Sequence, residues 1–546
     1  MAYCPADMGA RVGVRRSGPS VGASLPAILI TLAVAITPLG GCSTDDPPEA
    51  AGTSTTVAPV APSLLSPPVD LRRLYNLPPL RDGSDDEAGR LAQGTQVRQR
   101  AERLGLGART AHEAWSTAAD TVTTNREQLP ALLDRSLPKR SFKGTRLSEL
   151  GKLLADVGPA HVTVVRPTLV ADTSLTISGH NVSVDFAGAV IRTGSRPPAW
   201  AIEIRGARNV AVLNAEIAGG ANGILVDAST GVSVVGNELH DLSQNGIVVS
   251  GGSHAAIRSN RLHGLQRSGI VLHGDVTDSL LEGNEIHDLT GHSNWHAGIL
   301  ITGRSRDIAA DPAAFNAYGV AGEPIVDRLR NPSRNVVVGN DIRDGRSSGI
   351  YNDGGIANVL VDNDVVGNAK EGLCLDNGAT ANVVAGNTVT ANGNRWGQPD
   401  EVLANDSVLD EGRAPDGTAI AKLPGISIDN ALYNEVHANT VARNFGGGIK
   451  MVRTSFFNVI SGNVLTDNNL GRSDRFHFFG IELGAAVPDF AEPDLDFVGS
   501  SGNVVVGNQI HGDHHAGVYV AAASVQNEII GNDVDGAAAI EIERPS

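Results

Sequence analysis

The sequence is poor in cysteine, in aromatic residues and in basic side chains. Its three cysteines, Cys4, Cys42 and Cys374, are too few and too scattered for a disulfide framework or a cysteine metal site. Aromatic residues make up 4% of the 546 residues, and 60 acidic side chains outnumber 43 basic ones, giving a formal net charge of −17. That charge argues against broad attraction to nucleic-acid phosphates, so we expect no nucleic-acid partner. Because cysteines are so few, we expect the fold to be stabilised by packing.

Long hydrophobic runs are also scarce, and the clearest one lies near the N-terminus. Residues 11–16 contain three arginines, and the apolar run Leu25–Leu39 that comes next is interrupted by two prolines. A membrane-spanning helix needs about 20 apolar residues, so the pattern indicates a secretory signal instead. The run ends in Leu-Gly-Gly followed by Cys42, which resembles the lipobox of bacterial lipoproteins. The resemblance implies cleavage after residue 41 and lipidation of Cys42.

We therefore expect an exported protein held by a lipid on the extracytoplasmic face of the cell membrane. The alternative is an ordinary secretory signal cut nearby, with Cys42 incidental. Residues 42–70 are rich in Pro, Ala, Ser and Thr, which is typical of a flexible tether. Residues 71–160 predict a small helical region, with helices expected over 85–103, 108–133 and 147–157. The last of these has helical apolar spacing, and we expect it to cap the strand-rich region that begins at residue 161.

After residue 160 the sequence repeats with a short period. A phrase of the form Asn-Val-x-Val-x-(Gly/Ser/Asp)-Asn-x-(Ile/Leu/Val) recurs, mostly at spacings of 23 or 24 residues, with three longer insertions. Such a period predicts stacked units that bury their apolar faces against each other. The second asparagine of the phrase suits turns that hydrogen-bond the backbone and tolerate left-handed conformation, so we expect it to be structural. It falls at Asn214, Asn237, Asn260, Asn284, Asn340, Asn363, Asn387, Asn439, Asn463, Asn508 and Asn532.

The strands and turns within each period favour one solenoid architecture. A leucine-rich horseshoe would need regularly spaced leucines and a helical half-repeat, whereas each period here holds short β-branched strands separated by Gly and Asn. The repeat over residues 161–546 resembles the right-handed parallel β-helix of the pectin-lyase-like superfamily. The resemblance implies an all-β solenoid, a single-stranded right-handed parallel β-helix. It does not imply one activity, because that fold carries lyases, hydrolases, epimerases and binding proteins. We expect a monomer.

A second phrase places polar residues at matching positions. Its copies begin at Gly349, Gly372, Gly425 and Gly448, each interpreted as a turn residue that leads into a strand. Because side chains alternate across a strand, the residues two and four positions after each glycine share the outward face. Stacking then forms two rows, the first with Tyr351, Cys374, Ser427 and Lys450, the second, here called the aspartate row, with Asp353, Asp376 and Asp429.

The same register extends in both directions and is flanked by insertions. Before the aspartate row it predicts Asp227, Ser250, His273 and Thr302, and after Lys450 it predicts Glu482, Tyr519 and Glu541. Insertions at 303–334, 390–424, 467–479 and 485–500 would wall a cleft over this face. Aromatic and histidine side chains on these loops suggest platforms for sugar rings, although they could equally pack the loops onto the solenoid. They are Trp295, Trp396, Phe476, Phe478, Phe479, His292, His296 and His477.

Three functions remain open for this face. A glycoside hydrolase would use one carboxylic acid and one carboxylate. A polysaccharide lyase or epimerase would hold Ca²⁺ through the carboxylates, with Lys450 or Arg453 as base or as partner of a uronate. A non-catalytic protein would bind a polysaccharide or cell-envelope glycan there. No cofactor other than this possible Ca²⁺ is implied.

The layout is similar to that of polygalacturonase-type hydrolases, with aspartates on consecutive coils and Lys and Arg beyond. The similarity implies Asp376 and Asp429 as acid and base, Asp353 as a third carboxylate, and Lys450 with Arg453 as substrate-orienting cations. The sequence departs from that family where Asn377 replaces a second aspartate and where no Gly-His-Gly is present after it. For substrate binding we single out residues around the rows and on the loops: Tyr351, His273, Trp295, Trp396, His477 and Glu482. His514 and His515 are expected to be exposed in a turn.

Overall fold

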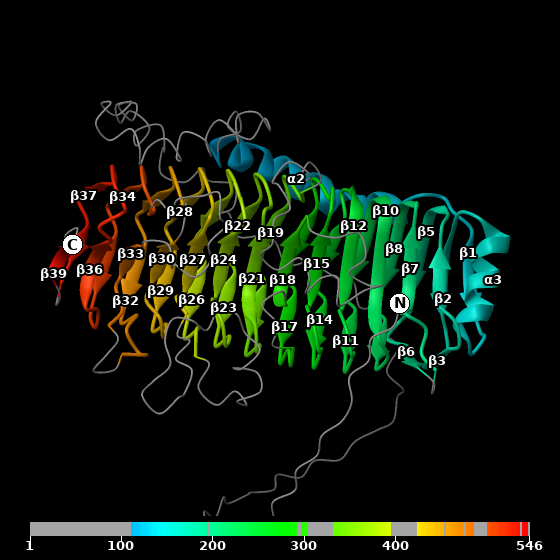
Figure 1. Cartoon of the computed structure of the whole chain (residues 1–546). Helices are drawn as coiled ribbons and strands as arrows, with labels where there is room; N and C mark the ends of the chain where they lie inside the picture. The colour runs from blue at the N-terminus through cyan, green and yellow to red at the C-terminus, as the bar shows by residue number, and fades with distance from the viewer. Residues whose placement is uncertain are drawn as a thin grey trace, which may run out of the picture. The chain divides into compact units, whose positions relative to one another are not determined.

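The computed structural model describes one unit of the chain as a long solenoid (Figure 1). Described are residues 111–193, 196–291, 296–303, 331–394, 423–452, 455–472, 477–484, 499–535 and 538–543. They all belong to the unit Pro62–Ser546. The described part contains helices α2 (Ala111–Leu133) and α3 (Leu147–Val157), and neither is long and apolar enough to cross a membrane.

The strands form three parallel columns, one strand of each per coil. The first and second columns are joined through the long strand β10 into a 26-stranded sheet, and the third column is a 13-stranded sheet. The first column comprises β4 (Leu175–Ile177), β7 (Trp200–Arg205), β10 (Asn222–Val235), β12 (Ile247–Ser253), β15 (Ile270–His273), β18 (Ala297–Thr302), β21 (Ser348–Asp353), β24 (Leu373–Asp376), β27 (Ile426–Asp429), β30 (Ile449–Val452), β33 (Ile481–Leu483), β36 (Ala516–Val520) and β39 (Ala538–Ile542).

The other two columns close the coil. The second comprises β1 (Lys139–Phe142), β2 (Ala160–Val164), β5 (His180–Asp185), β8 (Arg208–Leu213), part of β10, β13 (Ala256–Arg258), β16 (Leu280–Glu282), β19 (Val336–Val338), β22 (Val359–Val361), β25 (Val383–Ala385), β28 (Glu435–His437), β31 (Val459–Ser461), β34 (Val504–Val506) and β37 (Glu528–Ile530). The third comprises β3 (Thr168–Ala171), β6 (Val190–Thr193), β9 (Glu216–Ala218), β11 (Glu238–His240), β14 (Arg261–His263), β17 (Glu285–His287), β20 (Asp341–Arg343), β23 (Asp364–Val366), β26 (Thr388–Thr390), β29 (Thr440–Ala442), β32 (Val464–Thr466), β35 (Gln509–His511) and β38 (Asp533–Val534).

The predicted parallel β-helix is therefore confirmed. Inward-facing Ile, Leu and Val side chains from all three columns form one continuous core, typified by Ile350, Leu360 and Val365 of a single coil, each fully buried. β-Branched and leucine side chains suit this role because they pack well on a pleated surface. Strand pairing begins earlier than the expected boundary at residue 161, since β1 pairs in parallel with β2.

The repeated asparagines form buried ladders at the corners of the coils. In the ladder through Asn363 and Asn387, the side-chain Nδ2 of one asparagine donates to the Oδ1 of the next at 2.9 Å, and that Oδ1 also accepts the first residue's backbone N–H. A buried amide group left without partners would cost about 1–3 kcal/mol, so the ladder satisfies groups that the turn would otherwise expose to an apolar interior. The structural role expected for these asparagines is confirmed.

Two details of the expected asparagine turns are wrong. Asn214 does not belong to the series, because Ala215 occupies the position that pairs with Asn237 and donates its N–H to the Asn237 Oδ1. Asn214 instead takes the left-handed conformation, with φ of 53°. In later coils the left-handed residue is likewise the one before the ladder asparagine, as at Ser259 and Asp362, and not the asparagine itself.

The four glycines at the starts of β21, β24, β27 and β30 are required by close packing. A Cβ on Gly349 would lie 2.3 Å from Val365 Cγ1 and 2.6 Å from the carbonyl oxygen of Gly372. Gly372, Gly425 and Gly448 would meet equivalent neighbours at 2.4–2.9 Å. Gly372, Gly425 and Gly448 lie in bends that lead into their strands, as expected, whereas Gly349 lies inside β21. Their φ angles are not positive, so it is the missing side chain that these positions require.

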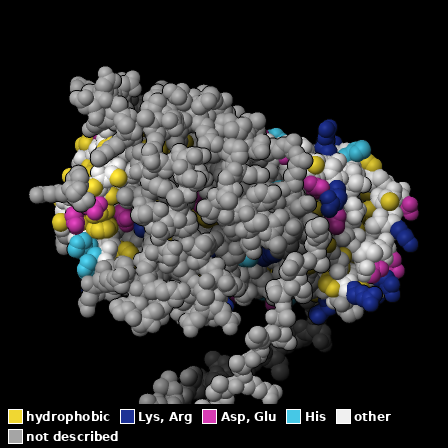
Figure 2. All heavy atoms as spheres, viewed as in Figure 1, with side chains coloured by type: hydrophobic (Ala, Val, Ile, Leu, Met, Phe, Trp, Pro, Cys, Tyr) yellow, Lys and Arg dark blue, Asp and Glu magenta, His cyan; other side chains and the backbone are white. Residues whose placement is uncertain are grey.

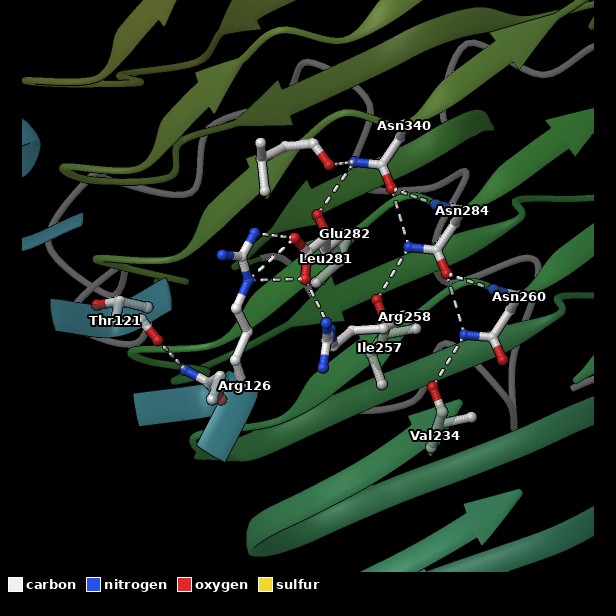
Figure 3. A network of polar contacts seen from close by, with 12 residues as sticks. Thr121, Arg126, Val234, Ile257, Arg258, Asn260, Leu281, Glu282, Asn284 and Asn340 are labelled. Carbon is white, nitrogen blue, oxygen red and sulfur yellow. Dashed lines mark hydrogen bonds and ion pairs between the residues drawn. The ribbon is translucent and has the colours of Figure 1, made fainter. Parts of the chain in front are cut away.

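The two helices cover the N-terminal end and the second column. α3 buries Leu147, Leu150 and Leu154 against the first coils, as expected for a capping helix. α2 ends at Leu133 as expected, and its described part packs across the second column from β25 to β5. Figure 3 shows how polar contacts hold it there. Arg126 of α2 and the buried Arg258 both contact Glu282, the latter at 2.7 Å, and Asn125 donates to the carbonyl of Asp278 at 2.8 Å.

Candidate functional site

The strand register brings the three aspartates together on the outward face of the first column. Asp353 of β21 pairs with Asp376 of β24, which pairs with Asp429 of β27. Neighbouring parallel strands lie about 4.8 Å apart, so three carboxylates separated by 76 residues of sequence occupy adjacent positions. The first row has the same register, through Tyr351, Cys374, Ser427 and Lys450. Both predicted rows are confirmed.

Asp353 is the most enclosed of the three aspartates. Its side chain is 2% exposed, and each carboxylate oxygen accepts a hydrogen bond of 2.8 Å, one from Thr302 Oγ1 and one from Asn377 Nδ2. A carboxylate that accepts donors at both oxygens is held in one orientation. Asp353 is thus positioned to fix its neighbours and presents little surface of its own.

Asp376 is supported from two sides. The backbone N–H of Asn377 donates to its Oδ1 at 2.6 Å, and the Tyr351 hydroxyl donates to its Oδ2. Burial, and then the charge of Asp376, raises the pKa of Tyr351 well above its ordinary value, so the phenol remains a donor. Both carboxylate oxygens of Asp376 are therefore held in place by donors from the protein.

Asp429 lies next to Asp376 and is more open to solvent, being half-buried. Beyond it, Lys450 Nζ lies 3.7 Å from Glu482 Oε1 of the following strand. Cys374, between the tyrosine and Ser427, is buried, and burial followed by the charge of Glu371 raises the pKa of its thiol well above the ordinary value. It is therefore a packing residue and not a nucleophile.

Several predicted residues can now be placed, and others fall outside the described chain. His273 is 5% exposed, bonds Ser250 at 3.3 Å and lies two strands before Asp353. Exposed His477 lies in the segment that leads into β33. Arg453, Trp295, Trp396 and Cys42 lie outside the described residues, as do most of the four insertions expected to wall the cleft.

Asn377 and the turn it forms were missed in the sequence. The residue after each aspartate of the row is left-handed, with φ of 76° at Gly354, 53° at Asn377 and 49° at Asn430. The recurring Asp-Gly or Asp-Asn pair is a turn signal that could have revealed this feature. In the coil of Asp376, the turn aims the Asn377 amide back at Asp353.

Aromatic rings cluster at the C-terminal end of the same face. Phe479 and Tyr519 stack with ring centroids 4.4 Å apart, and the exposed His477 and His515 stack at 4.5 Å. Tyr519 comes after Glu482 in the register and donates its hydroxyl to Glu543 Oε2 at 3.1 Å. Figure 2 shows hydrophobic, acidic and histidine side chains at this end of the solenoid.

One expectation about histidine is wrong. His514 is 6% exposed, and its Nε2 accepts the backbone N–H of Asn468 at 3.2 Å, in place of the next asparagine of a corner ladder. Burial lowers its pKa to about 4, which keeps the ring neutral as an acceptor. His515, its neighbour, is exposed as expected.

Within the described ranges, no group of three or more His, Cys, Asp or Glu side chains is arranged to hold a metal ion. The carboxylates of the aspartate row lie on successive strands along the solenoid, and both oxygens of Asp353 already accept hydrogen bonds from protein donors. The row by itself therefore does not form the convergent oxygen cage that Ca²⁺ prefers.

Comparison with known proteins supports the fold. A family model described as a right handed beta helix region matches residues 171–321. None of the curated proteins compared matches the sequence. Among solved structures, the chain is similar to the A-module of an Azotobacter vinelandii mannuronan C-5 epimerase, with 13% identity, a TM-score of 0.43, and coverage of 73% of this chain and 97% of the other.

The chain is also similar to two further solved structures. The catalytic domain of a GH87 alpha-1,3-glucanase is 10% identical, with a TM-score of 0.45 and coverage of 76% of this chain and 69% of that domain. The tailspike protein of Escherichia coli bacteriophage HK620 is 10% identical, with a TM-score of 0.43 and coverage of 72% and 74%. Similarity at this level does not identify an activity, which has to be argued from the residues of this chain.

Proposed function

We propose that the protein hydrolyses glycosidic bonds of a polysaccharide bound across the first column, with Asp376 and Asp429 as the catalytic pair. The observation that carries the proposal is the register of the aspartate row, which places two carboxylates on neighbouring strands beside Lys450. Like charges at such spacing are unfavourable unless one group holds a proton, and a proton shared unequally between two carboxyl groups is what acid-base hydrolysis requires.

The two aspartates differ in their surroundings, and this supports distinct roles. Asp376 accepts hydrogen bonds from Tyr351 and the Asn377 N–H, so it acts as the carboxylate that takes a proton from water. Asp429, beside that negative charge, holds the proton and gives it to the leaving oxygen as the glycosidic C–O bond breaks. The water oxygen then forms the new C–O bond, and the proton balance between the two groups is restored through solvent.

The remaining residues position this pair. Asp353, fixed by Thr302 and Asn377, keeps the Asn377 turn in place. Lys450 lies next in register after Ser427 and orients substrate hydroxyl groups, with Glu482 partly balancing its charge. His273 extends the polar face on the N-terminal side.

A glycan screen on the purified protein tests the reaction type. Neutral, amino and acidic polysaccharides of bacterial envelopes and plant walls are incubated with and without a calcium chelator. We expect new reducing ends, no ultraviolet-absorbing unsaturated product, and full activity under chelation. Unsaturated products would indicate a lyase, altered sugar composition without cleavage an epimerase, and binding without any product a glycan-binding protein; each of these would contradict the proposal.

Export and anchoring are part of the same proposal. We infer from the basic region, the apolar run and the Leu-Gly-Gly-Cys sequence that the chain is exported, acylated at Cys42 and held outside the cytoplasmic membrane, where envelope glycans are present. Residues 42–70 would then serve as a tether between the lipid and the solenoid. A monomer suffices, because the whole row lies within one chain.

A further inference from the structure

The aromatic cluster at the C-terminal end of the first column is not used by the hydrolysis described above. Its members are Phe479, Tyr519, His477 and His515, defined here as the distal cluster. Tyr519 and Phe479 are half-buried, and the His515 side chain is 41% exposed. In a chain with 4% aromatic residues, four rings in mutual contact at the surface are unusual. Aromatic rings with one apolar side and a polar tip are suited to recognition.

The distal cluster is aligned with the aspartate row. Strand pairings link β24 to β27, β27 to β30, β30 to β33 and β33 to β36, so Tyr519 is four strands from Asp376. At about 4.8 Å per strand the separation along the solenoid is about 19 Å, roughly one sugar residue per strand. A polysaccharide that crosses the strands at right angles would therefore span four or five residues between the two places.

The charges around the distal cluster restrict which sugar fits. Glu482 precedes Tyr519 in the register and Glu541 comes after it, and Glu543 accepts the Tyr519 hydroxyl. Burial, and then the hydrogen bond to Glu543, raises the pKa of Tyr519 to about 12, so the phenol stays neutral. Carboxylates accept hydrogen bonds from sugar hydroxyl groups but repel a uronate.

We propose that the distal cluster is a sugar-binding subsite that stacks an uncharged residue of the glycan chain against Phe479, Tyr519 and His515, with Glu482 and Glu541 accepting its hydroxyl groups. This inference rests on the proposed function and narrows it. The substrate is a neutral polysaccharide, and efficient binding requires a chain long enough to reach from Asp376 to Tyr519.

The test measures affinity as a function of chain length. The probe is a size-fractionated set of oligosaccharides from two to eight residues, prepared by partial hydrolysis of the polysaccharide that the wild-type protein binds in the screen. Titration calorimetry uses wild type, Phe479→Ala, Tyr519→Ala and the control His263→Ala. His263 also belongs to a ring stack, with centroids 5.1 Å apart, but on the third column.

We expect wild-type affinity to rise up to about five residues and then level off. Phe479→Ala and Tyr519→Ala should weaken the longer oligosaccharides about tenfold and leave the shortest ones unchanged, while His263→Ala changes nothing. Long oligosaccharides that bind the two cluster variants as tightly as wild type would overturn the subsite. So would preferred binding of oligogalacturonate or alginate, or no binding of any neutral glycan.

Failure of this inference is distinguishable from failure of the proposed reaction. Circular dichroism first establishes that each variant is folded, and conservative Tyr519→Phe should retain most of the affinity because the ring is preserved. A distal cluster that binds glycan in a protein without turnover would leave the subsite standing and reject only the hydrolysis. Turnover that does not depend on chain length would reject the subsite and leave the proposed hydrolysis standing.

Discussion

At the scale of single residues, the local surroundings decide what each carboxylate can do. Asp353 and Asp376 are adjacent members of one row, and each accepts a hydrogen bond at both oxygens. The donors differ, because two side chains donate to Asp353, whereas a tyrosine hydroxyl and a backbone N–H donate to Asp376. The sequence predicts that both face outward, because strand alternation is a local property. The register also places Thr302 before Asp353, as the structure shows. The sequence does not predict the contacts made by Asn377, since they depend on its left-handed turn.

Glu435 offers a test of burial that is independent of the candidate site. The side chain is 2% exposed, neither carboxylate oxygen has a hydrogen-bond partner among the described residues, and burial raises its pKa to about 7. The folded protein therefore binds the proton more tightly than the unfolded chain. The stability from this group is fully present below pH 4.5, the ordinary pKa, and is lost as the pH rises through about 7.

We expect Glu435→Gln to unfold at higher denaturant than wild type at pH 8, with a gain of about 3 kcal/mol, and to show no gain at pH 4. The control is Glu528→Gln, at the same register position three strands further on and only half-buried. Equal stability of Glu435→Gln and wild type across this pH range would show that the carboxyl group is solvated.

At the scale of elements, the repeat period is strong evidence for stacked strands, and the four strand starts were found from the sequence to within one residue of Gly349, Gly372, Gly425 and Gly448. The reason for those glycines was not, because the clash that excludes a Cβ involves a third-column side chain from about 16 residues away and a carbonyl of the next coil. Helix α2 shows the same limit. Its end at Leu133 was predicted, but its place over the second column involves contacts such as that with Glu282, more than a hundred residues later.

Two glycine-to-alanine changes compare a glycine that has no room for a Cβ with one that has room. In Gly372→Ala the new Cβ would lie 2.4 Å from Val389 Cγ1, so we expect a loss of about 1–3 kcal/mol in the free energy of unfolding. Gly151, inside helix α3, has room for a Cβ, with its nearest contact at 3.7 Å. Gly151→Ala should therefore stabilise the protein by about 1 kcal/mol through helix propensity. Equilibrium denaturation measures both, and the same sign for the two variants would refute the packing argument.

At the scale of the whole molecule, one chain presents a row of polar groups on a scaffold whose core and corner ladders repeat along its length. The register of that row was predictable because the same glycine-led phrase recurs at each of these strands, even across the insertion between Asp376 and Asp429. The cleft walls stay a prediction, because most residues of the insertions at 303–334, 390–424 and 485–500 lie outside the described part of the chain.

Location in the cell is also a property of the whole molecule. We expect the wild-type protein to fractionate with membranes and to enter the detergent phase on phase separation, because an acylated Cys42 supplies a lipid. Cys42→Ser should appear in the soluble fraction, while Cys374→Ser, a change at a buried residue of the solenoid, should stay with the membrane. Identical partitioning of Cys42→Ser and wild type would reject lipidation.

The most direct test of the account is turnover by Asp376→Asn and Asp429→Asn on the glycan identified in the screen, with Asp364→Asn on the exposed third column as the matched control. Asparagine keeps the volume and removes the ionisable group, so both variants should lose about 10²–10⁴-fold in rate while remaining folded. Their thermal stability should be equal to that of wild type or higher, since like-charge repulsion is relieved. Full turnover by both variants, with the control also active, would contradict a catalytic role for the aspartate row.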